Sequence, residues 1–286
     1  MTTPAEISLS AIDHLGVVGR DIGILTAAFT RLGFVPTNPA PLMGVKDGSP
    51  VPLGQDSAHL IFADSYVELS GVHSTDPHHH LAPFLARYEG LHILALGTDD
   101  ADASHAALTA QGLETPPVQN AGRHVDYGTK HGDAKFKWFK APDALGSEGF
   151  VCLVEQLTPE LVFQPPSDGH PNGALSVSGV TVLCVNVEDA VQRFAAYPRA
   201  EVGGRNRVTF GNQEIVFLDE PALVAAFGRD TGLPVPALAG FTVTVRDIAA
   251  TRTFLTGQGV AVQDSEAGVW VHPRDACGAI LRFTQA

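Results

Sequence analysis

Four segments of the chain repeat the same arrangement of apolar and polar positions. Each opens with a short apolar stretch, passes through an acidic turn into a segment with helical spacing, and ends in further apolar stretches. In the first segment, Val67 and Leu69 alternate with Tyr66, Glu68 and Ser70, and this period of two predicts a half-buried strand. We therefore predict a strand–helix–three-strand unit (βαβββ) that occurs four times.

The helix expected in the first unit has both a start and a stop signal. Asp21 stands where an N-cap residue would begin it, and Gly33 stands where it would end. In the second unit, Thr98 or Asp99 is expected to take the capping position. The apolar residues between the first two signals recur at helical spacing, at Ile22, Leu25, Phe29 and Leu32.

The units are expected to pair into two halves. The Pro-rich stretch 158–174 is the clearest boundary, so we predict domains over residues 1–165 and 166–286. Residues 38–58 are rich in Pro and Gly and predict a long loop inside the first unit. Residues 119–133 are polar and indicate an insertion inside the second unit.

Two histidines take the same position in two of the units. His14 lies seven residues before Asp21 (21 − 14 = 7), and His92 lies seven residues before Asp99 (99 − 92 = 7). On this spacing both histidines fall on the first strand of their unit. A single histidine on a strand is usually an ordinary hydrogen-bonded residue of the core or the surface. The case for a functional site therefore depends on finding histidine at the same position in two units.

Two glutamates strengthen the coincidence, because Glu68 and Glu155 both lie in the last strand of the same two units. If the units pair about a pseudo-two-fold axis, the two imidazoles and the two carboxylates converge. That set suits one divalent ion of zinc, nickel, cobalt, manganese or iron(II), with an open position for substrate. The third unit has Thr181 at the histidine position, and the fourth has Gly240 or Phe241. The site is therefore expected in the N-terminal half.

Several stretches resemble the vicinal oxygen chelate superfamily, which includes glyoxalase I, extradiol dioxygenases and bleomycin-resistance proteins. The resemblance rests on "DHLGVV…GF…YVEL" and "LHILAL…FVCLVEQL", while "TPELVFQP…HPNGA" is similar to glyoxalase-like domain proteins. It implies an α+β fold of four βαβββ modules, paired into two halves with curved mixed sheets. It also implies the metal ligands His14, Glu68, His92 and Glu155.

The same resemblance implies an enzyme that acts on a small oxygenated metabolite. A metal-bound carbonyl or enediolate oxygen would be stabilised, and Glu68 or Glu155 would be the catalytic base of an isomerase or a lyase. If only His14, His92 and Glu155 bound the ion, the set would resemble the facial triad of an iron(II) extradiol dioxygenase. The remaining alternative is a metal-free protein that binds or sequesters a small molecule.

Further residues are candidates for substrate binding. Tyr66 and Ser70 share a strand face with Glu68. The polar insertion could be a lid over the site, with an ordinary solvated loop as the alternative. Its side chains suited to an anionic substrate are Arg123, Tyr127 and Lys130. His170 and Asn172 are expected to fix the linker between the halves by hydrogen bonds, with entry into the cleft as the alternative.

The amino-acid composition disfavours several classes of binding partner. Of the 286 residues, 18 are Lys or Arg and 31 are Asp or Glu, which gives a net charge of −13 and disfavours binding to nucleic acid or an anionic membrane. The three cysteines lie far apart and support neither a disulfide framework nor a thiolate zinc site. Neither a signal peptide nor a membrane span is evident, so we expect a cytoplasmic protein with a small-molecule substrate. A homodimer is possible, but no feature of the sequence requires it.

Overall fold

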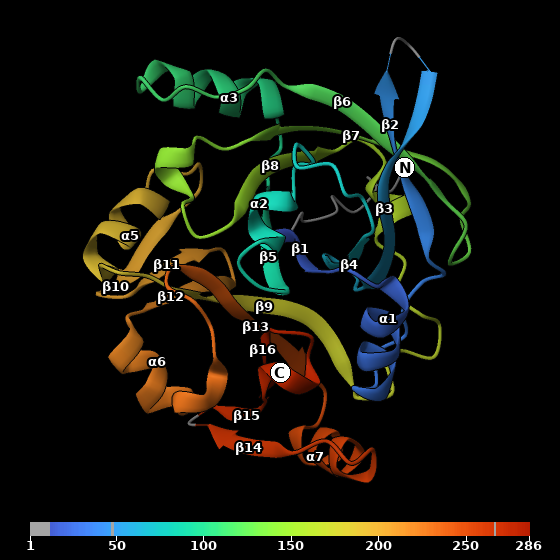
Figure 1. Cartoon of the computed structure of the whole chain (residues 1–286), viewed down its shortest axis with the longest axis vertical. Coiled ribbons are helices and arrows are strands. Elements are labelled where there is room, and N and C mark those ends of the chain that lie inside the picture. Colours follow the sequence, from blue (N-terminus) through green and yellow to red (C-terminus); the bar gives the residue numbers. More distant parts are fainter. Residues whose placement is uncertain (1–11, 47–48, 266) are drawn as a thin grey trace, which may run out of the picture.

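The computed structural model describes residues 12–46, 49–265 and 267–286, whose strands form two curved, mixed sheets of eight strands each (Figure 1). The N-terminal sheet has the order β2 (Ala40–Lys46), β3 (Ser49–Ile61), β4 (Tyr66–Val72), β1 (Ile12–Gly19), β5 (Gly90–Gly97), β8 (Phe150–Gln156), β7 (Gly132–Lys140), β6 (Gln119–Val125). The C-terminal sheet has the order β10 (Glu201–Gly204), β11 (Arg207–Phe210), β12 (Gln213–Leu218), β9 (Ala174–Leu183), β13 (Ala237–Val245), β16 (Ile280–Gln285), β15 (Gly268–Val271), β14 (Val262–Ser265).

The predicted α+β fold of four βαβββ units is confirmed, because each unit consists of a strand, a helix and three further strands. The helices of the units are α1 (Ile22–Arg31), α3 (Ala101–Ala110), α5 (Val187–Phe194) and α7 (Ile248–Gly257). Short helices occupy the connections between units: α2 (Ala82–Leu85), α4 (Pro159–Val162) and α6 (Glu220–Phe227). Single 3-10 turns lie at Asp143–Leu145, Arg229–Thr231 and Pro273–Asp275. None of the helices in the described ranges is long and apolar enough to cross a bilayer.

The helix caps agree with the sequence in the first unit and differ by one residue in the second. Asp21 caps α1 by accepting from the backbone N–H groups of Gly23 and Ile24. The cap of α3 is Asp100, whose side chain accepts from the N–H of Ala103 at 2.9 Å, and neither Thr98 nor Asp99 takes that role. This difference of one residue changes which positions of the two units correspond.

Two segments expected to be irregular are strands instead. Most of residues 38–58 forms the hairpin of β2 and β3, not a long loop. β2 lies at the edge of the sheet, where a proline's missing N–H costs no ladder hydrogen bond, so Pro41 is accommodated. The polar insertion forms β6 at the other edge and pairs with β7.

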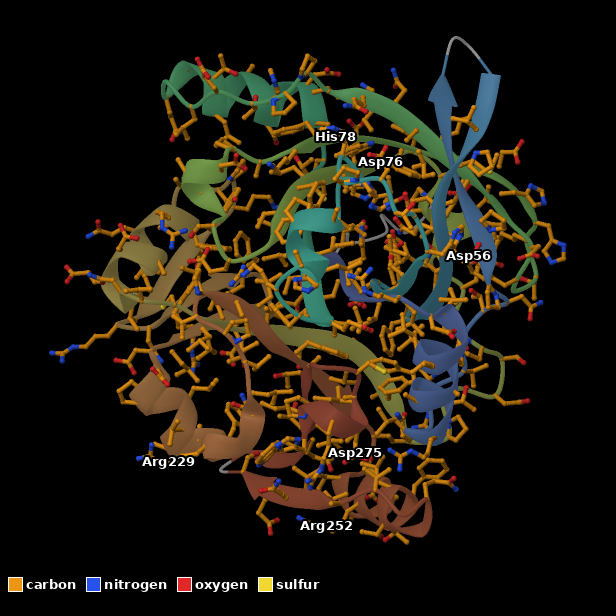
Figure 2. The ribbon with its side chains drawn as sticks, viewed as in Figure 1. Asp56, Asp76, His78, Arg229, Arg252 and Asp275 are labelled. Atoms are coloured by element: carbon orange, nitrogen blue, oxygen red, sulfur yellow. The ribbon has the colours of Figure 1, made fainter. Side chains whose placement is uncertain are left out.

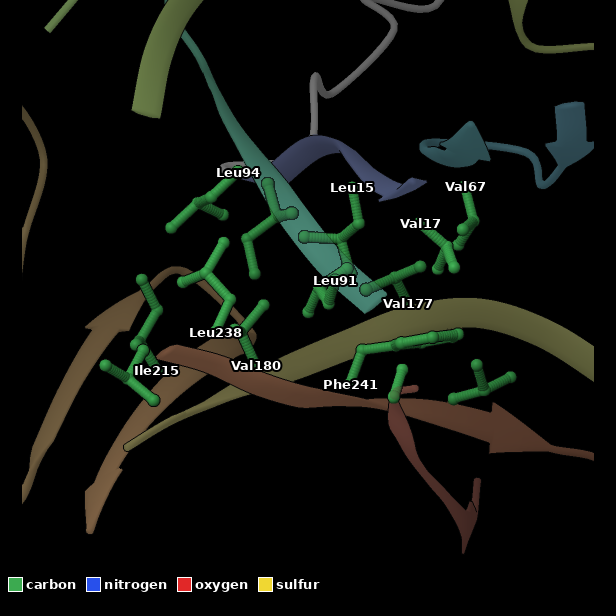
Figure 3. Packing of buried hydrophobic residues seen from close by; sticks show 14 of the residues in the cluster. Leu15, Val17, Val67, Leu91, Leu94, Val177, Val180, Ile215, Leu238 and Phe241 are labelled. Atoms are coloured by element: carbon green, nitrogen blue, oxygen red, sulfur yellow. The ribbon is translucent and has the colours of Figure 1, made fainter. Parts of the chain in front are cut away.

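The two sheets pack back to back around one shared core. Leu15 and Leu94 from the N-terminal sheet contact the same cluster as Val180 and Phe241 from the C-terminal sheet (Figure 3). Side chains alternate between the two faces of a strand. The residues next to Leu15 and next to Leu94 along their own strands therefore point to the opposite, inner face of the sheet. Each half therefore has its own inner face, turned away from the shared core.

The N-terminal sheet closes to a shape close to a barrel. Ile61 and Tyr66, from β3 and β4, share a buried cluster with Val125 and Ala134, from β6 and β7. These strands lie toward opposite ends of the sheet order, so their contact brings the two ends together. The inner face is consequently lined from all sides.

The linker between the halves is held as the sequence predicts. The ring of His170 accepts from the N–H of Val35 at 3.1 Å and lies 3.1 Å from the carbonyl oxygen of Ile61. The side-chain amide of Asn172 donates to the carbonyl oxygen of Leu32 at 2.9 Å. These bonds attach the linker to the end of α1 and to β3.

Candidate functional site

Two rows of residues cross the inner face of the N-terminal sheet at its centre. Residues paired across neighbouring strands point to the same face, so the members of one row lie beside each other. The first row runs across β4, β1, β5 and β8 through Glu68, Gly16, Ile93 and Phe150. The second runs across the same strands through Tyr66, His14, Ala95 and Cys152.

The carboxylate of Glu68 is oriented through one of its oxygens. Oε1 accepts from the hydroxyls of Ser57 and Ser70, each at 2.7 Å, and from the amide of Gln55 at 3.2 Å. Oε2 has no hydrogen-bond partner among the described residues. Three donors on one oxygen fix the carboxylate plane and leave the other oxygen for a ligand. Ser70, expected to bind substrate, therefore acts on Glu68 directly.

His14 is held between an aromatic ring and a carboxylate. Its imidazole stacks on Tyr66 with ring centroids 4.4 Å apart, and its Nδ1 lies 2.7 Å from Oδ1 of Asp13. Asp13 is buried and also accepts from Gln156 at 3.1 Å. Because a carboxylate only accepts, we place the ring proton on Nδ1, and Nε2 has no protein partner in the described ranges.

Asp13 was not predicted from the sequence. Strand alternation would turn it away from His14, but a register shift between Ile12 and His14 interrupts the pairing of β1 with β5. The only sequence signal is its position next to the histidine.

Arg123 and Tyr127 of the polar insertion reach the same region. The guanidinium of Arg123 lies 5.7 Å from the ring centre of Tyr66 and donates to the hydroxyl of Tyr127 at 2.7 Å, which in turn donates to the carbonyl of Val162. Burial raises the pKa of Tyr66 well above 10, and the charges of Asp13 and Glu68 raise it further while Arg123 opposes them. The Tyr66 phenol therefore stays protonated.

Lys130 does not share that region. It is exposed in the turn between β6 and β7, where Gln164 accepts from the backbone N–H groups of Thr129 and Lys130 at 2.9 and 2.8 Å. The insertion is thus a hairpin built into the sheet and tied down at its turn, which differs from both the lid and the solvated loop considered from the sequence.

His59 joins the site from β3 without having been predicted. It pairs with Glu68 across the ladder, and its ring meets that of Tyr66 edge to face at 5.4 Å. Burial lowers the pKa of His59 well below 6.5, with Arg123 and His14 adding to the effect, so the ring is neutral. It was missed because its segment was expected to begin in a loop, which hid the alternation of β3.

His92 lies away from the two rows. It sits at a second register shift of β5, between Leu91 and Ile93, and is three residues, about 10 Å, along the strand from the partner of His14. Its Nε2 lies 2.8 Å from the carbonyl oxygen of Tyr88, and its ring packs on Tyr88 with centroids 4.2 Å apart. Burial lowers the pKa of His92 to about 4. The structure gives His92 a packing role.

Glu155 faces the other side of the sheet. Its Oε2 accepts from the N–H of Ala101, in the first turn of α3, at 2.9 Å and lies 3.9 Å from Nζ of Lys137. The next residue, Gln156, is the one that points inward and reaches Asp13. Glu155 therefore helps to cap α3 and is separated from Glu68 by the thickness of the sheet.

The register of the central strands gives the true correspondence between the first two units. His14 pairs with Ala95, and Gly16 pairs with Ile93. Adding 79 to the residue numbers of β1 gives the equivalent residues of β5, so that His14 becomes Ile93 and Gly16 becomes Ala95 (93 − 14 = 79; 95 − 16 = 79). This shift turns each of the two pairs into the other. The caps shift by the same amount, since Asp100 lies seven residues after Ile93. Ile93 is therefore the counterpart of His14.

The last strands correspond in the same way. β1 pairs His14 with Tyr66 and Gly16 with Glu68, while β5 pairs Ile93 with Phe150 and Ala95 with Cys152. The shift between these strands is 84 residues (150 − 66 = 84; 152 − 68 = 84). The counterpart of Glu68 is therefore Cys152, a buried thiol whose pKa is raised by burial.

The four side chains expected to hold a metal thus do not converge. His14 and Glu68 share the inner face, whereas Ile93 and Cys152 occupy the two counterpart positions. In residues 12–46, 49–265 and 267–286, no group of three or more His, Cys, Asp or Glu side chains could hold a metal ion. The residues present do not fit a two-His, two-Glu centre.

Comparison with known proteins identifies the fold and one family. The family model described as a glyoxalase-like domain matches residues 12–197, which is more than half of the chain. No curated protein matches the sequence significantly.

Solved structures match over nearly the whole chain at low identity. A hypothetical protein from Staphylococcus aureus is 12% identical, with 96% of this chain and 99% of that chain covered at a TM-score of 0.66. A mutant of 4-hydroxymandelate synthase from Streptomyces coelicolor is 15% identical, with 97% and 92% covered at 0.58. A catechol 2,3-dioxygenase is 12% identical, with 98% and 89% covered at 0.56. These likenesses establish the two-half architecture.

Proposed function

The chain belongs to the glyoxalase-like domain family, and on that premise we propose that its N-terminal half is an enzyme that transfers a proton on a small oxygenated molecule. The observation that supports this most directly is the carboxylate of Glu68, held through Oε1 by three donors while Oε2 has no partner among the described residues. A fixed carboxylate with one available oxygen suits a general base.

His14 supplies the second group of the proposed reaction. Its Nδ1–H is fixed by Asp13, so Nε2 is the nitrogen that can hold or deliver a proton. In an isomerisation, Oε2 of Glu68 would take a proton from the carbon next to a carbonyl. Nε2 of protonated His14 would give a proton to the carbonyl oxygen, and the Asp13 carboxylate would stabilise the charged ring. To complete the isomerisation, Glu68 would give its proton to the neighbouring carbon, and Nε2 of the now neutral His14 would take a proton from the hydroxyl group on the original carbon.

The opposite wall of the inner face indicates the kind of substrate. Ala95, Cys152 and Val154 form a buried cluster with Trp138 and Phe150, whose rings lie 6.2 Å apart. Most polar groups thus come from β3, β4 and β1, with Gln156 added by β8, whereas the apolar groups come from β5, β8 and β7. A small molecule with an oxygenated edge and a flat apolar part would complement both walls. Arg123 and Tyr127 are proposed to contact its oxygens.

The family's metal has no place in this proposal. Proteins of the vicinal oxygen chelate superfamily typically bind a divalent metal, but here Ile93 and Cys152 stand at the second pair of positions. We therefore assign no step to a metal. The dioxygenase alternative also lacks its triad, because His92 and Glu155 do not lie with His14.

Deuterium exchange tests the proposal without knowledge of the true substrate. Small α-hydroxy ketones, hydroxy aldehydes and 2-oxo acids are incubated with the protein in D₂O, and exchange at the carbon next to the carbonyl is followed by NMR. We expect catalysed exchange that Glu68→Gln reduces on the order of 100-fold or more. Glu155→Gln is the matched control and should leave the rate unchanged. Equal rates for the wild type and Glu68→Gln, or no catalysed exchange with any probe, would contradict the proposal.

Sequestration is the second candidate, and the apolar wall around Trp138 favours it. Such a protein would bind a flat molecule, quench Trp138 fluorescence and release the molecule unchanged. Saturable quenching without exchange would establish this alternative, whereas quenching with exchange that depends on Glu68 supports the enzyme.

A further inference from the structure

The C-terminal half has a cavity of about 290 Å³ on its own inner face. Most of its lining residues are polar, and they include Glu214, Thr242, Arg282 and Thr284. At about 30 Å³ for each water, this volume corresponds to about ten water molecules, enough for a small metabolite.

The cavity lies at the counterpart of the site in the N-terminal half. Glu214 pairs with Gly179, Gly179 with Thr242, and Thr242 with Arg282, so these residues form one row across β12, β9, β13 and β16. The central pair Val180–Phe241 corresponds to Leu15–Leu94, which aligns this row with Tyr66, His14, Ala95 and Cys152. Gly179, and not Thr181 as expected from the sequence, stands where His14 stands, and it leaves the row without a side chain at that point.

Arg282 is the exceptional member of this row. Its guanidinium has neither an ion pair nor a hydrogen bond among the described residues, and its Nε is fully buried. Its only ring contact there is with Phe227, 6.0 Å away. Arg282 as a whole is half-buried, and it lines the cavity without a carboxylate partner of its own in the described part of the chain. A guanidinium in this position can donate to an anionic ligand that supplies the missing charge.

The neighbouring charges do not neutralise Arg282. Glu214 lies on the same wall, but its carboxylate forms an ion pair with Arg207 at 2.9 Å. Two arginines and one glutamate leave a local charge of +1 in a chain whose net charge is −13. Burial lowers the pKa of Arg282, with Arg207 adding to this and Glu214 opposing it. The hydroxyls of Thr242 and Thr284 add hydrogen-bonding groups around the cation.

We propose that this cavity is a second binding site, specific for a small organic molecule that carries one carboxylate or phosphate group held by Arg282. The planar guanidinium can donate two parallel hydrogen bonds to either anion. The site is independent of the proton-transfer reaction proposed for the N-terminal half, because it uses no residue of that half.

Trp270 provides a fluorescent reporter next to a residue that lines the cavity. It pairs with Arg282 across β15 and β16, and the chain has only two tryptophans. In a Trp138→Phe background, Trp270 fluorescence is titrated with lactate, with glycerol phosphate and with the neutral analogue lactamide. We expect one of the two anions to give a saturable change, and lactamide to bind at least about tenfold more weakly. The stronger anion distinguishes the carboxylate from the phosphate.

Two variants and one control test the role of Arg282. Arg282→Met keeps the apolar stem and should weaken anion binding at least about tenfold. Glu214→Gln removes the nearby negative charge and should tighten it, which keeps the test informative if the first variant folds poorly. The control is Arg252→Met, an exposed arginine of α7 at the outer edge of this half, which should bind as the parent does (Figure 2). No saturable change with either anion, or equal binding by the parent, Arg282→Met and Glu214→Gln, would overturn the proposal.

Discussion

Ile93 in the second unit stands where His14 stands in the first, and its side chain packs directly over Gly16. A Cβ atom added to Gly16 would lie 2.6 Å from Cδ1 of Ile93, so the isoleucine fills the space above the central strand. An apolar side chain thus occupies the middle of the row that begins at Glu68. An apolar contact therefore stands at the position where a symmetric ligand set would need a second histidine.

Restoring the second pair should create a metal site. We expect the double variant Ile93→His, Cys152→Glu to bind one zinc or nickel ion per chain with a Kd of about 1 μM or tighter, which is about −8 kcal/mol. The measurement is calorimetric titration, with elemental analysis after dialysis. The matched control, Ile93→Gln with Cys152→Gln, should bind no ion. Stoichiometric metal in the wild-type protein, or none in the double variant, would show that the correspondence drawn here is incorrect.

The contact between Gly16 and Ile93 predicts a stability difference. Gly16→Ala should lower the free energy of unfolding by about 1–3 kcal/mol, because the added methyl group overpacks the sheet. Gly257→Ala is the control, since that helical glycine has open space around its Cβ position and the change should be neutral or stabilising. Urea denaturation measures both. Equal effects of the two changes would rule out the tight packing described for Ile93.

Glu68 and Glu155 should respond differently to the same change. Glu155→Ala removes an acceptor at the start of α3 and should cost about 1 kcal/mol of stability, with no effect on ligand binding. Glu68→Leu leaves three polar side chains without their acceptor and should cost about 2–4 kcal/mol. Glu68→Gln keeps an acceptor oxygen and should cost less. Chemical denaturation gives the order, and a larger loss for Glu155→Ala than for Glu68→Leu would contradict these roles.

Stability should fall as the pH falls from 6.5 toward 4, in part because of His92. Its pKa is about 4 in the folded protein and about 6.5 when unfolded, so between these values the unfolded chain binds more protons. The contribution of His92 is complete above pH 6.5 and is lost progressively below it, up to about 3 kcal/mol in all.

His92→Gln tests this contribution, since glutamine can still donate to the carbonyl of Tyr88. The slope of unfolding free energy against pH should decrease by up to about 1.4 kcal/mol per pH unit over this range. His59 and His170, whose pKa values are also lowered by burial, account for part of the remaining slope. An unchanged slope would mean that His92 is not the buried neutral ring seen here.

The sequence by itself determined the units and their order. The signals were local: alternation in β4, helical spacing in α1 and a capping aspartate. Such features can be recognised in a sequence without knowing which segments pack against each other. It also identified His14 and Glu68, which lie on one inner face, and the hydrogen bonds of His170 and Asn172 that hold the linker.

Only the tertiary structure decided which residues of the two units correspond. The sequence offers two adjacent aspartates, Asp99 and Asp100, and the choice between them shifts the second unit by one residue. In a strand, one residue is the difference between one face and the other, and the register shifts of β1 and β5 cannot be seen in the sequence. For that reason the chain alone suggested His92 and Glu155, whereas strand pairing places Ile93 and Cys152 beside His14 and Glu68.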